Sequence, residues 1–421
     1  MRFSQMHHKT TLANGIRVVS EGIDHVRSIS IGIWVQSGSR YENHSSNGTA
    51  HFIEHMLFKG TDRRSACDIA AEIDSVGGIM NACTGKEMTS FYIKIPDYHL
   101  PLAIDLLADI FQSSRFHEEE IGKERSVVLQ EISMLEDSPD EYIHDFFEAV
   151  FWGNHPLGLS VLGTKDQINN MKRDSIVTFF NERYRGDNMV LSAAGRLKHD
   201  DLVDLVTTAF GSIERKTAHT LVSTPEVASN IAVLEKDLEQ VHMMIGTIAP
   251  SATSPDRYPA FLLNAVLGGS MSSRLFQEIR EKRGLAYAIH SYLSPYADTG
   301  LLGIYAGIGE DRIRLVVDLI EDCLKRLCNE RLTEKEMHAA REMIKGNFLL
   351  SMESTDTRMM RLAKNEICFG KYIPPEDVLT RIDAVTREEV RNLACEMFNP
   401  RVVSLTAIGR VSRGDVAFRW N

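Results

Sequence analysis

Two stretches of the sequence, DNMVLSAAGR at 187–196 and RVVSLTAIGR at 401–410, decide the fold because they show that the chain repeats itself. Each is an apolar segment ending in Gly-Arg, and each follows a helical segment that ends in an aromatic residue. Residues 89–112 and 299–324 also correspond: a β-branched and aromatic strand passes through a polar turn into a helix with an apolar stripe. The repeat has a period of roughly 210 residues, which is too long for a solenoid.

This duplication predicts the fold class. Strands followed by groups of helices indicate an α+β domain with a mainly antiparallel sheet packed against helices, and the repeat indicates that the domain is built twice. We expect a first domain at 1–212, a linker in the polar stretch 213–230, and a second, homologous domain at 231–421.

Composition narrows the classes of function. The 421 residues are 43% hydrophobic and 25% charged, as in ordinary globular proteins. No apolar run reaches the roughly 18 residues of a membrane span, and the net charge of −11 argues against nucleic-acid or anionic-membrane binding and favours a cationic substrate. The six cysteines form no CxxC pair and the chain opens without an apolar signal region, so we expect reduced thiols and a cytoplasmic protein.

The candidate chemistry lies in residues 50–60, AHFIEHMLFKG. On a helix, His51 and His55 stand at i and i+4 on one face, so both imidazoles could bind one metal ion. Glu54 lies between them, near the metal but free to take a proton from a bound water. This is HxxEH, the inverted form of a zinc-peptidase signature. A catalytic zinc typically takes three protein ligands, so the third must come from elsewhere. The alternative is a pair of ordinary histidines on an apolar helix.

The second half of the chain is an internal control for this motif. When Gly60 is aligned with Gly269, the two histidine positions and the glutamate position carry small, apolar and amide residues in the copy: Ala260, Leu263 and Asn264. A purely structural role should recur in the copy. The fold therefore does not require the metal-binding types, and their presence in the first half indicates a chemical role.

At these residues the chain resembles the pitrilysin family of zinc metallopeptidases (the inverzincins), and within it the processing peptidases and their bacterial relatives. The resemblance covers essentially the whole chain and rests on NGIRVVSE (14–21), HFIEHMLFKGT (51–61), GGIMNACTGKEMT (77–89), VVLQEISMLEDSPDE (127–141) and SSRLFQEIREKRGLAY (272–287). It implies a zinc-dependent endopeptidase with one Zn²⁺ per chain. Its substrates would be peptides or unfolded, presequence-like segments cleaved inside a chamber, possibly near Arg.

The resemblance also implies roles for residues of the metal site. Glu131 would be the third zinc ligand. Glu124, two helical turns earlier on the same face, would support the site. Arg280 and Tyr287, from the second half, would stabilise the developing oxyanion or anchor the substrate backbone. The alternatives are a solvated acidic helix face for the two glutamates, and a surface Arg with a core Tyr for the other pair.

Further residues are implied to bind substrate. The substrate would lie as an added strand along Asn81, Ala82, Cys83 and Thr84, held mainly by backbone hydrogen bonds. Glu141 and Asp145, at i and i+4, would hold a substrate Arg between two carboxylates. The alternatives are a turn-flanking Asn and a plain solvated acidic face. The segment LGGSMSSRLF (267–276) departs from close relatives, since Ser270 stands where they often have a third Gly.

The resemblance leaves two questions of assembly and role open. Because the chain has one duplication, a closed chamber would require two chains: a homodimer, or a heterodimer with an inactive homologue. The alternative function is a noncatalytic structural or substrate-binding subunit of a larger assembly. Such subunits typically lose the metal ligands or the base, whereas HxxEH and Glu131 are intact here.

Overall fold

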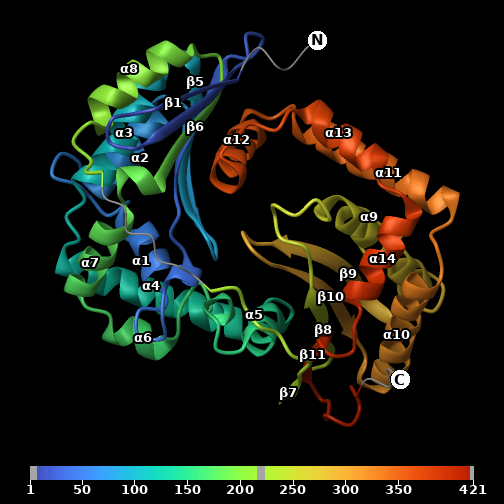
Figure 1. Cartoon of the computed structure of the whole chain (residues 1–421). Helices are drawn as coiled ribbons and strands as arrows, with labels where there is room; N and C mark the ends of the chain where they lie inside the picture. The colour runs from blue at the N-terminus through green and yellow to red at the C-terminus, as the bar shows by residue number, and fades with distance from the viewer. Residues whose placement is uncertain (1–6, 216–222, 418–421) are drawn as a thin grey trace. The chain divides into compact units, whose positions relative to one another are not determined.

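Two β-sheets organise the residues that the structure, a computed structural model, describes: 7–215 and 223–417 (Figure 1). The first sheet has the strand order β1-β2-β6-β3-β5-β4 and is antiparallel except for the β2–β6 pair. Its strands are β1 (His7–Thr11), β2 (Arg17–Gly22), β3 (Ser28–Val35), β4 (Ile79–Thr84), β5 (Thr89–Pro96) and β6 (Met189–Gly195). β4 therefore lies at an edge of this sheet.

Helices cover both faces of the first sheet, because successive side chains of its strands point to opposite sides. Ile31 and Ile33 of β3 belong to a core shared with α3, whereas Trp34 points to the opposite face, against α12. Figure 1 shows α3 and α12 on these two sides. The helices of this unit are α1 (Thr49–Met56), α2 (Ala66–Ser75), α3 (Leu100–Gln112), α4 (Glu118–Glu136), α6 (Lys165–Asn170), α7 (Arg173–Arg183), α8 (His199–Phe210) and α12 (Thr355–Phe369).

The second sheet repeats this plan with the order β7-β11-β8-β10-β9. It comprises β7 (Ile231–Glu235), β8 (Val241–Ile248), β9 (Ala286–Pro295), β10 (Gly300–Ile308) and β11 (Ser404–Gly409). One face packs against α9 (Arg257–Leu267), α10 (Ile313–Asn329) and α14 (Arg387–Met397), while the other packs against α5 (Pro139–Trp152). α11 (Glu334–Ser351) and α13 (Pro375–Ala384) complete the helices. The prediction of two similar α+β halves with mainly antiparallel sheets is confirmed.

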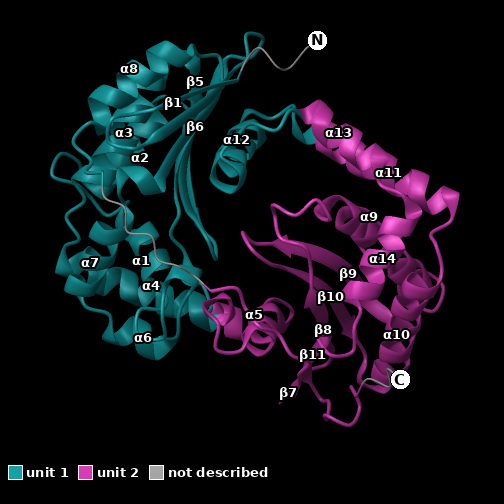
Figure 2. Ribbon diagram, viewed as in Figure 1, with its two compact units in different colours: residues 1–133, 159–222, 350–374 teal, residues 134–158, 223–349, 375–421 magenta. Residues whose placement is uncertain are grey.

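The two compact units are not continuous in sequence (Figure 2). Unit 1 comprises residues 1–133, 159–222 and 350–374, and unit 2 comprises residues 134–158, 223–349 and 375–421. Each half of the chain thus supplies one helix, α5 or α12, to the sheet of the other half. The predicted linker at 213–230 falls between α8 and β7 along the chain, and its residues 216–222 lie outside the described residues. The predicted continuous domains 1–212 and 231–421 do not include the exchange of α5 and α12. Sequence periodicity shows that a helix has an apolar face, not which sheet covers that face.

We expect α12 to depend on a buried ion pair with the first sheet. The Arg358 guanidinium binds the Glu21 carboxylate of β2, and Glu21 is only 1% exposed. Arg358→Met would leave this carboxylate buried and unpaired, so the free energy of unfolding should fall by about 3–5 kcal/mol in urea titrations. Lys364→Met, at an exposed position of the same helix, should change it by less than about 0.5 kcal/mol. Equal effects of the two variants would contradict this role of the pair.

No helix within the described residues is both long enough and apolar enough to cross a lipid bilayer.

Candidate active site

The helix α1, which carries both motif histidines, is anchored at its N-terminus by the buried carboxylate of Glu42. The backbone N–H groups of Gly48 and Ala50 donate to Glu42 Oε2 and Oε1 at 2.8 and 2.6 Å. These donors have no partner within a helix, and a negative charge is favourable at this end of the helix dipole. Burial raises the pKa of Glu42, and the hydrogen bonds oppose that shift. Gly48 itself has φ +88°, a conformation that a side chain would strain.

Three side chains from α1 and α4 converge on one point. Nε2 of His51 and Nε2 of His55 each lie 3.7 Å from Oε2 of Glu131. Across residues 7–215 and 223–417, these three are the one group of histidine, cysteine or acidic side chains close enough to hold a metal ion, with ligand atoms all within 4.8 Å of one another. Zinc–ligand bonds of roughly 2.0–2.2 Å place neighbouring ligand atoms about 3–4 Å apart. The two nitrogens and one oxygen therefore fit zinc both in chemistry and in spacing.

The two imidazoles sit in different electrostatic surroundings. Burial, followed by the neighbouring His55, lowers the pKa of His51 to about 4, so His51 is neutral at physiological pH, the form in which an imidazole binds metal. For His55, burial lowers the pKa, but the hydrogen bond with Glu124 and the nearby carboxylates outweigh it and raise the pKa. The Nδ1 atom of His51 is buried without a hydrogen-bond partner among the described residues.

A chain of charged contacts holds His55 in place. Its Nδ1 lies 3.0 Å from Oε2 of Glu124, and Oε1 of the same carboxylate lies 2.7 Å from Nζ of Lys59. Burial acts to raise the pKa of Glu124, but the bonds from His55 and Lys59 prevail and lower it. Because an ionised Glu124 accepts a hydrogen bond from the N–H at Nδ1, Nε2 of His55 is left free to face a metal.

Glu54 lies beside the end of the edge strand β4. The Thr84 hydroxyl, on the last residue of β4, donates to Glu54 Oε2 at 2.5 Å. Burial raises the pKa of Glu54, while the bond from Thr84 and the charge of His55 oppose the shift. A carboxylate with a raised pKa is a better base at neutral pH, and the hydrogen bond fixes where it points.

The strand β4 has one free edge among the described residues, where it pairs only with β5. Met80 and Ala82 pack against the core, whereas Asn81 and Cys83 on the opposite face are exposed. The Asn81 side-chain oxygen accepts a hydrogen bond from the N–H of Ala82 at 2.8 Å, so this amide folds back onto its own strand. An exposed edge of this kind can pair with an extended peptide.

Comparison of the sequence with known proteins assigns the chain to a family. Residues 17–165 match the family model described as Insulinase (Peptidase family M16), and residues 170–344 match that of the Peptidase M16 inactive domain. An uncharacterized zinc protease of Bacillus subtilis (strain 168) is 40% identical over 393 residues, which cover 93% of this chain and 96% of that protein. The chain belongs to peptidase family M16. The resemblance inferred from its motifs is thereby confirmed.

Further matches support the assignment of the chain to family M16. An uncharacterized zinc protease of Mycobacterium tuberculosis (strain ATCC 25618 / H37Rv) is 39% identical over 402 residues, covering 93% of this chain and 91% of that protein. Two solved structures share the fold: a protease from Helicobacter pylori (TM-score 0.89, 23% identity, 96% of this chain and 99% of the other) and a peptidase M16 inactive domain from Pseudomonas fluorescens (TM-score 0.91, 19% identity, 96% and 98%).

Four predicted site residues lie in unit 2: Arg280, Tyr287, Glu141 and Asp145. The three candidate zinc ligands, here called the metal group (His51, His55 and Glu131), lie in unit 1. The exposed Arg280 belongs to a short π-helical turn, Phe276–Glu281, with its guanidinium 4.8 Å from the centre of the Phe276 ring. Tyr287 lies on the edge strand β9 and is 78% exposed. It is therefore not the core tyrosine considered as the alternative.

The acidic pair and the glycine-rich segment also belong to unit 2. Glu141 and Asp145 lie one turn apart on α5; Glu141 is exposed and Asp145 half-buried. The hydroxyl of Ser270 contacts that of Ser272 at 3.1 Å and the carbonyl oxygen of Ala265 at 3.5 Å.

Two residues that position the site, Glu42 and Lys59, were not identified as functional from the sequence, and Thr84 was implied only as part of the substrate strand. Lys59 follows His55 by four residues, a spacing that would place both side chains on one face of a helix, but α1 ends at Met56. Thr84 falls within the quoted strand segment, but its bond to Glu54 spans 30 residues. Glu42 has no local signal, since it caps a helix that begins seven residues later.

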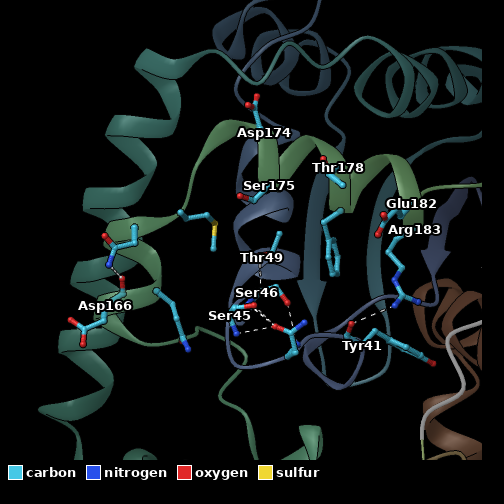
Figure 3. Close-up of a pocket in the computed structure, with 15 residues that line it drawn as sticks. Tyr41, Ser45, Ser46, Thr49, Asp166, Asp174, Ser175, Thr178, Glu182 and Arg183 are labelled. Carbon is cyan, nitrogen blue, oxygen red and sulfur yellow. Dashed lines mark hydrogen bonds between the residues drawn. The ribbon is translucent and has the colours of Figure 1, made fainter.

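A separate polar hollow of about 830 Å³ lies between the 41–49 loop and the helices α6 and α7 (Figure 3). It is lined in part by Asp166, Asp174 and Glu182, and Arg183 stacks 5.0 Å from the centre of the Tyr41 ring. The hollow reaches Thr49, the first residue of α1, but includes none of the three metal-group residues.

Proposed function

We propose that this M16 chain is a zinc-dependent endopeptidase that holds one zinc ion per chain on His51, His55 and Glu131. The observation that carries the proposal is the convergence of these three ligand atoms, with Glu54 beside them at the end of a free strand edge. The names of the curated relatives, zinc proteases of bacteria, support the same reading. The substrates are peptides or unfolded segments, because only an extended chain can pair with β4.

Each residue of the site has a separate role in the proposed reaction. When bound, the zinc ion would act as a Lewis acid toward the scissile carbonyl and would lower the pKa of a bound water to near neutrality. Glu54 accepts the proton of the attacking water and then donates a proton to the leaving amine. Thr84 aims the Glu54 carboxylate, and Glu124 keeps the His55 ring in the required tautomer. The backbone of β4 aligns the substrate beside this base, and Arg280 and Tyr287 stabilise the oxyanion or hold the substrate backbone.

The proposal is tested by assaying the purified full chain on a panel of fluorogenic peptides. Cleavage should stop with a chelator and return when zinc is added, because the metal is required for the chemistry. A chain that binds zinc but cleaves no peptide would favour a noncatalytic subunit. The match of the second half to an inactive domain is compatible with both readings, but the complete metal group and base favour catalysis.

Lys59→Met should weaken zinc binding. Without its ammonium, the Glu124 carboxylate, only 5% exposed, loses the partner that fixes its position against His55. Outer-shell contacts of this kind are typically worth about 10- to 100-fold in metal affinity. Competition with a chromogenic chelator should show a loss of that size, while Lys59→Arg, which keeps the charge, should lose less. Unchanged affinity in Lys59→Met would show that the contact has no influence on the metal.

We further propose that Glu141 and Asp145 select Arg-containing substrates. Replacing both with Ala should lower kcat/KM for a peptide with Arg near the cleavage site by at least about 10-fold, since a hydrogen bond to a charged group contributes about 1.5–3 kcal/mol. A peptide with citrulline in place of that Arg keeps the shape and removes the charge, so its cleavage should change little. Equal losses on both peptides would leave the acidic pair without a role in specificity.

We also propose an assembly and a cellular location for the chain. A homodimer with two working sites is the simplest assembly, because the metal group, the base, Arg280 and Tyr287 all occur in one chain. A heterodimer with an inactive homologue is the alternative, and the mass in solution of the purified chain distinguishes the two. A cytoplasmic location in a bacterium stays a prediction.

A further inference from the structure

Two cysteines of unit 2 meet where α10 and α14 pack together. The Cys395 thiol of α14 donates to the carbonyl oxygen of Cys328 at 3.1 Å, and the Cys328 thiol of α10 donates to the carbonyl oxygen of Ala394 at 3.5 Å. Each thiol therefore lies against the backbone of the helix that carries the other cysteine. Both thiols are free. The two residues are 67 positions apart in sequence, so only the packing of α10 against α14 brings them together.

The two thiols differ in their exposure to solvent. Cys395 is exposed, so it is open to a small oxidant from solvent. Cys328 is half-buried and packs against the core of unit 2. Burial, and then the neighbouring Cys395, raises the pKa of Cys328 to about 12, which makes it a poor first target. An exposed thiol beside a second, resolving thiol is the arrangement of many redox-sensitive sites.

We propose that Cys328 and Cys395 form a reversible disulfide when the protein meets a hydroperoxide, and that this bond ties α10 to α14. In the first step the Cys395 sulfur takes one oxygen from the peroxide, which leaves as water or an alcohol, and becomes a sulfenic acid. In the second step the Cys328 sulfur attacks the sulfenic sulfur, forms the S–S bond and releases water. A dithiol reductant reverses the change. The two cysteines belong to unit 2, whereas His51, His55 and Glu131 belong to unit 1.

The inference is tested on the full, zinc-loaded chain by treatment with a small excess of hydrogen peroxide, alkylation of the remaining thiols, and mass spectrometry. The intact protein should lose about 2 Da and two alkylatable thiols, and dithiothreitol should restore both. Trypsin should release one linked species that joins residues 327–331 to residues 392–401. The midpoint of thermal unfolding should rise on oxidation, since the cross-link restricts the unfolded chain.

Variants separate this pair from general thiol oxidation. Cys328→Ser and Cys395→Ser should each abolish the linked peptide and the rise in the unfolding midpoint. Cys67→Ser, which removes another exposed cysteine, should retain both. Oxidation of Cys395 only to sulfinic or sulfonic acid, with Cys328 still open to alkylation, would overturn the proposal. The contact would then serve only to cap two helix ends.

Discussion

Glu54→Gln is expected to abolish turnover while zinc stays bound. The amide is nearly isosteric with the carboxylate and can still accept the hydrogen bond from Thr84, but it cannot take a proton. General base catalysis contributes about 10²–10⁴-fold, and here the same group must also return the proton, so kcat should fall by at least about 10³-fold. The measurement is steady-state cleavage of a fluorogenic peptide, together with zinc content by elemental analysis.

The matched control is Glu118→Gln, an exposed glutamate at the start of α4, which should keep full activity. Peptide cleavage by Glu54→Gln at the rate of the unaltered protein would remove Glu54 as the base. Loss of zinc from Glu54→Gln would mean instead that this carboxylate holds the metal, directly or through its neighbours.

His51→Ala should lose the metal and the activity together. It removes one of three ligand atoms, so the loss of zinc affinity should exceed the about 10- to 100-fold typical of outer-shell changes. Elemental analysis after dialysis should find the variant largely free of zinc, with cleavage at background level. The fold should persist, because the second half maintains the corresponding helix α9 with Ala260 at the aligned position.

The control for this variant is His25→Ala, an exposed histidine that lies outside the metal group. It should retain both zinc and activity. If His51→Ala kept a full complement of zinc after dialysis, the assignment of this imidazole as a ligand would be wrong.

Much of this fold could be predicted from the sequence because the evidence is local and occurs twice. The strand and helix patterns around 187–196 and 401–410 reflect which side chains are buried, and burial repeats in both halves. The exchange of α5 and α12 could not be predicted, because it depends on pairs such as Glu21 and Arg358, 337 residues apart. An amphipathic helix satisfies the same local pattern on either sheet.

The candidate site shows the same difference between local sequence patterns, which can be predicted, and contacts between distant residues, which cannot. His51 and His55 were identified because one helical turn places them together. Glu131 required the family resemblance, since no local spacing links α4 to α1. The contacts of Glu124 with Lys59, and of Glu54 with Thr84, are formed only when separate elements pack together. Residues that carry the chemistry thus had a sequence signal, whereas those that orient them mostly did not.

The central claim is that two imidazoles and one carboxylate from α1 and α4 hold a single zinc ion. It is tested most directly by a crystal structure of the zinc-loaded Glu54→Gln protein, with anomalous diffraction measured on both sides of the zinc edge. We predict one zinc peak per chain, within bonding distance of Nε2 of His51, Nε2 of His55 and a carboxylate oxygen of Glu131. A zinc peak elsewhere, or one that leaves the Glu131 carboxylate out of bonding range, would contradict the account.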